Sequence, residues 1–174
     1  EALNIGISTG VKALSASNGY YNDLATRIGL PPEAKIITQN VAKLPGGQAL
    51  VTKVVKNINA AASDAATNAV PIFASALTSM TINDAMGILK SKGTAATDYF
   101  KTKTKAPLKA LFGGYIDKSV NKKLIGNVSP QSCWNSMTSE WNEVASSTVG
   151  RLAGLTTVKT NLTDYLTDKA VDGM

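Results

Sequence analysis

Residues 48–70 read QALVTKVVKNINAAASDAATNAV, and this stretch decides the fold class. Its apolar side chains recur every three or four residues, the period of an α-helix with one apolar face. They are Leu50, Val51, Val54, Val55, Ile58, Ala61, Ala62, Ala65, Ala66 and Ala69. Because alanine is small, its half of the face predicts close approach by a neighbouring helix. Pro71 lacks an amide hydrogen and clashes one turn back, so it predicts a kink or a restart of the helix.

Helical periodicity continues on both sides of this stretch, and two-residue alternation persists nowhere for long. The further segments predicted as helices are 2–16, a short one through Ile36, Ile37 and Val41, a short one from Thr81 to Lys90, one on each side of Pro107, one starting at Pro130 and one starting near Thr163. We therefore expect an all-α fold with a single domain over residues 1–174. The expected architecture is a bundle of about six to eight helices, with one long helix kinked or broken near Pro71.

Two helix starts carry recognisable caps. Thr81 followed by Asp84 resembles a capping box, and Ser129 followed by Pro130 combines a cap with proline at the first helical position. Gly113 and Gly114 fall inside a predicted helix, where each costs about 1 kcal/mol relative to alanine. They predict a bend or a close helix crossing.

Composition excludes several kinds of enzyme. The chain has 174 residues, one cysteine and no histidine. Catalytic triads, HExxH zinc sites and histidine switches all need an imidazole, and P-loop or dinucleotide glycine patterns are absent. We predict no catalytic residue, no metal site and no cofactor. Cys133 is expected to be a small buried hydrophobic residue. Trp134, Met137, Trp141 and Val144 are expected to face the core.

The positive charge is concentrated in one segment. Between Lys90 and Lys123 there are nine lysines and two aspartates, a net charge of +7, whereas the rest of the chain sums to −1. Only two arginines occur, Arg27 and Arg151, and both lie outside the segment, which disfavours sequence-specific nucleic-acid recognition. The segment is either a solvated surface or a surface for an anionic partner. Its candidate residues are Lys101, Lys103, Lys105 and Lys109.

Asp164, Asp168 and Asp172 lie four residues apart on the last predicted helix, within an arc of about 80°. Such a row presents a surface to a basic partner or to a hard cation. However, successive turns separate the carboxylates by ~6 Å, too far for three of them to hold one calcium ion. Two other readings are interaction with the helix dipole and with Lys169, or inward rotation of Asp168 or Asp172 to cap another helix.

The other acidic residues favour a structural role. Asp84 and Asp98 each follow a threonine near a helix start, which is typical of capping. A carboxylate-dependent hydrolase assembled by folding from Asp84, Asp98, Asp164 and Asp168 is the enzymatic alternative.

The chain contains no predicted membrane span. Its longest uncharged run, residues 65–83, includes Pro71 and seven Thr, Asn and Ser side chains. The low content of charged residues, 17%, favours an exported protein. The sequence begins at Glu1 without methionine, so a precursor that has lost a leader and a trimmed chain are both open.

Four phrases carry a resemblance to a known family: LTDYLTDKAVDGM from Leu162, EALNIGI from Glu1, AVPIFASALTSMTINDAMGIL from Ala69 and AATDYFKTKT from Ala95. In their order along the chain, from Glu1 to Met174, they resemble a bacterial family catalogued as domain of unknown function four-one-nine-seven. The resemblance implies an all-helical domain, usually made with an export signal or a lipoprotein leader, with no assigned activity.

Three functions follow as hypotheses. The first is a non-enzymatic cell-envelope protein, periplasmic or outer-membrane-associated and exported with or without a lipid anchor. It would bind an envelope protein or an anionic lipid, with an acyl chain in a groove beside the alanine-rich helix and its head group on the lysines. The second is non-specific binding of nucleic acid or another anionic polymer through Lys90–Lys123. The third is the carboxylate-dependent hydrolase.

Overall fold

The computed structural model describes residues 2–35, 38–39, 42–43, 45–91, 93–124 and 126–174. In these residues the chain is built from α-helices and contains no strand, which confirms the all-α prediction. The elements are α1 (Ala2–Ser15), α2 (Gly19–Asn22), the 3-10 turn η1 (Pro32–Ala34), α4 (Gly47–Thr67), α5 (Val70–Thr78), α6 (Ile82–Lys90), α7 (Ala95–Asn121), α8 (Pro130–Ser146), α9 (Thr148–Leu152) and α10 (Leu162–Gly173). The predicted short helix through Ile36, Ile37 and Val41 lies outside the described residues.

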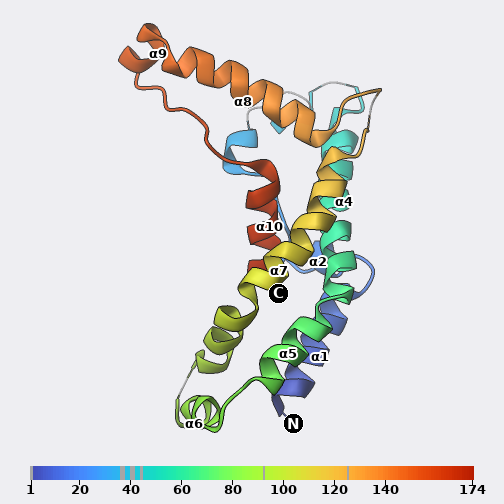
Figure 1. Cartoon of the computed structure of the whole chain (residues 1–174). Helices are drawn as coiled ribbons and strands as arrows, with labels where there is room; N and C mark the ends of the chain where they lie inside the picture. Colours follow the sequence, from blue (N-terminus) through green and yellow to red (C-terminus); the bar gives the residue numbers. More distant parts are fainter. Residues whose placement is uncertain (1, 36–37, 40–41, 44, 92, 125) are drawn as a thin grey trace.

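Helix α4 runs beside α7 and packs against α1, α2 and α7 (Figure 1). Its alanine half is fully enclosed, since Ala62, Ala65 and Ala66 expose no surface. The predicted close seam is therefore confirmed. One cluster of buried side chains joins this seam to the aromatic and aliphatic rows of α7 and α10.

The break near Pro71 is also confirmed. Helix α4 ends at Thr67, and α5 begins at Val70 with Pro71 in its first turn. The first turn of a helix is where a missing amide hydrogen costs least, because that amide has no partner within the helix. The proline thus starts a new helix and does not kink the old one.

Helix α7 corrects the prediction of two helices separated at Pro107, because it runs unbroken through 27 residues. Its buried positions follow at intervals of four residues on both sides of the proline: Phe100, Thr104, Leu108, Phe112, Ile116 and Val120. Pro107 itself lies on the exposed side, where the carbonyl freed one turn back can meet water. Burial of this continuous row outweighs the ~3 kcal/mol that an interior proline costs.

The predicted close crossing at Gly113 is present. A Cβ atom built on Gly113 would lie 3.9 Å from the side chain of Thr167 on α10, whereas one on Gly114 would meet nothing within 4 Å. Helices α7 and α10 therefore approach each other at Gly113. This crossing fixes how the lysines of α7 sit relative to the aspartates of α10.

Helix α8 extends away from the core and carries α9 at its far end (Figure 1). Trp134 is 5% exposed, as predicted, but Trp141 is 38% and Val144 55% exposed, so their predicted core positions are wrong. Beyond its first turns, α8 has little to pack against except the returning segment before α10. The indole N–H of Trp141 donates to the carbonyl of Thr156 in that segment, at 2.9 Å.

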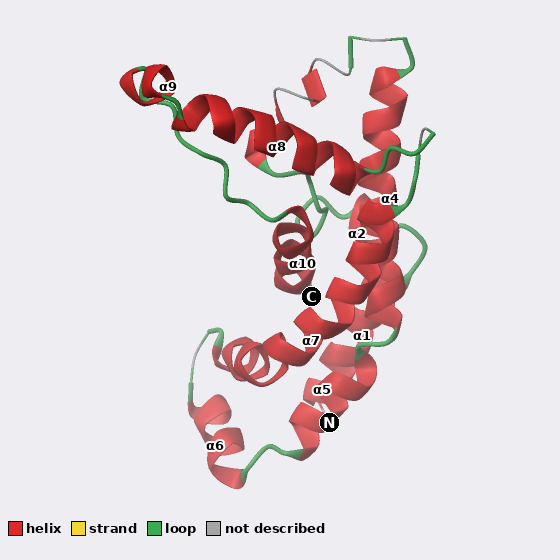
Figure 2. Cartoon of the chain, turned by 45° about the horizontal axis from the view of Figure 1, so that its top comes forward, coloured by secondary structure: helices red, strands yellow, loops and turns green. Residues whose placement is uncertain are grey.

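Helix α6 lies at the opposite end of the molecule from α9, beyond the end of α5 (Figures 1 and 2). The predicted capping box is confirmed: the Asp84 amide donates to the Thr81 hydroxyl at 3.1 Å, and the Thr81 amide donates to the Asp84 carboxylate at 3.0 Å. Among the described residues no single helix is long and apolar enough to cross a membrane. Only α5 and α6 taken together reach that length and composition, and they are bent by 100°.

Candidate functional site: a lysine-rimmed cleft

The N-terminal half of α7 carries two rows of side chains that differ in chemistry. Lys101, Lys105 and Lys109 follow each other at four-residue intervals and share one edge of the helix. The buried row of Phe100, Thr104 and Leu108 runs directly beside them. Any hollow at the boundary between the rows therefore has an apolar wall and a cationic edge.

Such a hollow exists between α7, α1, α5 and the end of α10, with a volume of about 310 Å³. Its floor is formed by buried side chains, and its rim carries the exposed Lys101, Lys105 and Asp172. The floor residues are Val11, Phe73, Phe100, Thr104 and Leu108. We call this hollow the lysine cleft.

Aromatic contacts hold the floor in place. The rings of Phe73 on α5 and Phe100 on α7 meet edge to face at a centroid distance of 6.1 Å. The Tyr99 hydroxyl next to Phe100 donates to the carbonyl of Ala76 on α5, at 3.0 Å. Helices α5 and α7 are thereby fixed to each other beneath the cleft.

The remaining wall belongs to α1, and sequence reasoning missed it. Gly6 and Gly10 line the cleft, and a Cβ atom on either would meet nothing within 4 Å. The hollow thus stays open partly because these positions carry no side chain. Their four-residue spacing on a predicted helix was the available signal, since it places two glycines on one helix face.

The aspartate row of α10 faces this lysine edge. Lys109 Nζ lies 2.6 Å from the Asp168 carboxylate, and both side chains are partly exposed, at 41% and 46%. The hydrogen bond from Lys109 to Asp168 raises the pKa of the lysine, and the charges of Asp164 and Asp172 act in the same direction. Two surfaces predicted separately from the sequence are therefore one site, in which Asp168 pairs with a lysine and does not cap another helix.

The other predicted site residues lie apart from the cleft. The Lys103 ammonium lies 5.8 Å from the centre of the Tyr99 ring, on a different side of α7 from Lys101 and Lys105. Asp164 is in the first turn of α10, where its amide donates to the Asn161 side chain at 3.0 Å. The cleft itself thus contains Lys101, Lys105 and Asp172, whereas the Lys109–Asp168 pair does not line it.

The carboxylates proposed for a hydrolase have separate partners. Asp84 closes the cap of α6, as predicted. Asp98 accepts a hydrogen bond from the Thr94 hydroxyl at 2.9 Å, but no side chain caps the start of α7, so the predicted capping role of Asp98 is wrong. Helices α6 and α10 lie at different levels of the molecule in both views (Figures 1 and 2). Within the described segments no group of three His, Cys, Asp or Glu residues could hold a metal ion.

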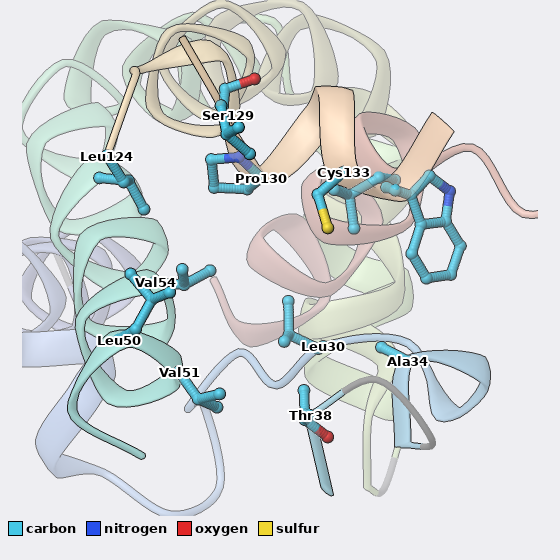
Figure 3. Close-up of a pocket in the computed structure, with 13 residues that line it drawn as sticks. Leu30, Ala34, Thr38, Leu50, Val51, Val54, Leu124, Ser129, Pro130 and Cys133 are labelled. Atoms are coloured by element: carbon cyan, nitrogen blue, oxygen red, sulfur yellow. The ribbon is translucent and has the colours of Figure 1, made fainter. Parts of the chain in front are cut away.

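A second cavity, of about 150 Å³, lies beside the N-terminal half of α4. Side chains of α4, of the segment around η1 and of the start of α8 converge on it (Figure 3). The sequence predicts a groove beside this alanine-rich helix. The cavity lies next to Leu50 and Val54 of the helix and not next to its alanines, because packing closes the alanine half. Cys133 lines it and is exposed, so its predicted burial is wrong; it lies where α8 leaves the core.

A ligand bound in this apolar cavity cannot also place its head group in the lysine cleft, because the two lie too far apart. From Lys105 to the end of α7 at Asn121 there are sixteen residues, or ~24 Å along the helix. The described residues that line the cavity include the hydroxyls of Thr38 and Ser129 but no charged side chain. It lacks the fixed charges that orient an anionic ligand. The lysine cleft does have an apolar floor beside lysines, but no residue of the alanine-rich helix α4 lines it, so it is not the groove predicted beside that helix.

The amino-acid sequence of the chain matches one known protein family. The family model described as "Protein of unknown function (DUF4197)" matches residues 1–174. The chain belongs to that family. The DUF4197 match covers α1, α7 and α10, which form the lysine cleft, and it confirms the resemblance seen in the sequence. No curated protein and no solved structure matches the chain.

Proposed function

We propose that this protein is a non-enzymatic helical scaffold that binds an anionic amphipathic ligand in the lysine cleft. The apolar chain of the ligand lies on the floor against Phe100 and Leu108, and its anionic group meets Lys101 and Lys105. The observation that carries the proposal is the junction of a buried apolar row with two exposed lysines across a cleft of about 310 Å³. That volume is at the lower end of the range for small-molecule sites, ~300–1,000 Å³.

The charges of the cleft support an anionic ligand of low charge. Lys101 and Lys105 form no ion pair with any described residue, whereas Lys109 is paired with Asp168. Asp172 shares the rim and offsets one positive charge. A ligand with one anionic group therefore competes with Asp172 for the lysines, and neutralising Asp172 strengthens binding.

The same placement disfavours binding of an anionic polymer through Lys90–Lys123. Lys109 is paired with a carboxylate, and Lys103 lies on a different side of α7 from Lys101 and Lys105. A polymer needs a continuous row of free lysines, and here the row is interrupted.

We include the cell envelope in the proposal, as a periplasmic or outer-membrane-associated location reached by export. A soluble carrier for amphipathic anions is useful where such molecules must cross an aqueous space between membranes. Fractionation of cells that express the full precursor tests this location separately, and recovery in the cytoplasm would refute it.

The ligand proposal is tested by calorimetric titration with dodecanoate below its micelle concentration. Dodecanoate should bind the wild-type protein, and Gly10→Leu, which places a side chain in the open cleft, should weaken binding more than about tenfold. The matched control is Gly114→Leu, since Gly114 on α7 also faces open space but lies outside the cleft. Equal affinity of the wild type and Gly10→Leu would contradict the proposal.

The lysines are tested in the same way. Lys101→Gln combined with Lys105→Gln should weaken dodecanoate binding about tenfold and leave binding of uncharged dodecanol unchanged. Lys103→Gln on the same helix serves as the control, because Lys103 does not line the cleft. Asp172→Asn should increase the affinity for dodecanoate. A decrease for Asp172→Asn would show that the anionic group does not meet these lysines.

A further inference from the structure

Helix α6 has an apolar surface wider than the contact it makes with the rest of the protein. Ala85 and Ile88 are half-buried on the side toward the core. Ile82, Met86 and Leu89 lie next to them within an arc of about 60° and are 83%, 43% and 78% exposed. No residue of this exposed face lines the lysine cleft or the apolar cavity.

The exposed face has a fixed shape and position. The capping box of Thr81 and Asp84 holds the first turn of α6, and α6 contacts α7. The helix lies at one end of the molecule in both views (Figures 1 and 2). Large apolar side chains that share one helix face at a projecting end form a convex surface, which suits insertion into a soft layer.

The charge around α6 decides what covers this face. Between residues 81 and 105 the chain has five lysines and two aspartates, a net charge of +3. Lys90, at the end of α6, is exposed and follows Met86 around the helix by about 40°. Hydrogen bonds from Thr81 are the main cause that lowers the pKa of Asp84 on α6, and the charge of Lys103 acts in the same direction, so Lys103 lies near α6. An apolar helix face with a cationic surround is complementary to an anionic bilayer surface.

We propose that α6 docks the protein on an anionic lipid bilayer, with Ile82, Met86 and Leu89 among the upper acyl chains and the neighbouring lysines against the anionic head groups. This contact is independent of the ligand in the lysine cleft. The lysine cleft and α6 nevertheless both adjoin the N-terminal half of α7. Docking through α6 therefore brings Lys101 and Lys105 to the same end of the molecule as the bilayer.

The test is co-sedimentation with vesicles of phosphatidylcholine alone and of phosphatidylcholine mixed with phosphatidylglycerol. The wild-type protein should bind the mixed vesicles, and added salt should weaken this binding. The double variant Ile82→Ser with Leu89→Ser should lose more than about tenfold in partitioning, because it removes two large apolar side chains from the contact.

A matched control is available on α9, where Val149 and Leu152 are 76% and 85% exposed at the opposite end of the molecule. Val149→Ser with Leu152→Ser should bind mixed vesicles within about twofold of the wild type. All four side chains are exposed, so circular dichroism should show both variants folded. Gly10→Leu, which fills the lysine cleft, should bind vesicles as the wild type does, and this separates docking from ligand binding.

Three results would each overturn the inference. They are a wild type that does not sediment with mixed vesicles, an α6 variant that binds them as well as the wild type, and an equal loss in the α9 variant. The last two would assign the apolar face of α6 to a protein partner or to no partner at all.

Discussion

Asn59 is the buried polar residue whose removal tests the fold most sharply. It exposes no surface and lies on α4 among the alanines and Ile58. Its side-chain oxygen accepts from the Ile28 amide at 2.8 Å, and its side-chain nitrogen donates to the carbonyls of Ile28 and Val55, each at 2.8 Å. Ile28 is 1% exposed, so one side chain satisfies both backbone groups of a buried residue 31 positions away in sequence.

Asn59→Ala leaves the amide and the carbonyl of Ile28 without their partner. Each buried backbone group that loses its partner costs about 1–3 kcal/mol, so the two together should lower the free energy of unfolding by about 4 kcal/mol. With a urea dependence near 2 kcal/mol per molar, the unfolding midpoint should fall by about 2 M. That is a large part of the stability of a typical domain.

Urea unfolding followed by circular dichroism measures this change. Asn57→Ala is the control, because Asn57 is two residues away on α4, is half-buried, and has a side chain that forms no hydrogen bond with any described residue. It should shift the free energy of unfolding by less than about 0.5 kcal/mol. A loss below about 1 kcal/mol for Asn59→Ala would refute the reasoning, since it would mean that water or another group can serve Ile28.

Three further perturbations test other parts of the fold. Tyr20→Phe removes a buried hydroxyl that donates to the last turn of α10 at 2.8 Å and should cost about 1 kcal/mol in urea unfolding at neutral pH. Burial raises the pKa of Tyr20, so the wild type should lose stability above pH ~10, where the unfolded chain ionises first, and the variant should lose less. Hydrogen bonds from the Thr81 amide and hydroxyl lower the pKa of Asp84. These bonds therefore stabilise the fold at pH values above the ordinary pKa of an aspartate. The stabilisation is lost as the pH falls through the lowered pKa of Asp84. In NMR titration Thr81→Ala should move the Asp84 midpoint upward. Gly19→Ala would drive a Cβ atom into the last carbonyls of α1 and should cost about 1–3 kcal/mol in thermal unfolding, whereas Gly6→Ala, which faces open space, should stabilise by up to ~1 kcal/mol.

The sequence predicted those parts of the fold that depend on local chemistry. The apolar row of α4, the restart at Pro71 and the caps at Thr81 and Ser129 each follow from a few neighbouring residues, and each is present. Pro107 shows where this reasoning ends. A proline inside a helix has a real local cost in free energy. Helix α7 continues through it because the side chains on both sides of Pro107 are buried by the whole bundle, which local sequence does not reveal.

Side-chain burial on α8 was mispredicted for a related reason. The spacing of Trp134 and Trp141 places both on one helix face, and that inference is sound. Whether a face is covered depends on how far the helix extends past its neighbours, which periodicity does not encode. Asn59 was missed because an asparagine in an alanine row gives no sign that it serves a distant backbone segment.

The candidate site was predicted in halves. The lysine row and the aspartate row each follow from four-residue spacing in the sequence. That the two rows face each other depends on the crossing of α7 and α10 near Gly113. The apolar floor was not foreseen, because Phe73 and Val11 reach it from helices that are distant in sequence.

Helix α10 links the stability of the core to the width of the lysine cleft. Its Leu166 and Ala170 are fully buried, while its Asp172 stands on the cleft rim one turn away. The Tyr20 hydroxyl holds the carbonyl of Ala170, and Gly173 lies so close to Tyr20 that a Cβ atom there would be 3.2 Å from the ring. Because one short helix makes both contacts, loosening its last turn should change the dodecanoate binding that we propose for the cleft before it unfolds the bundle.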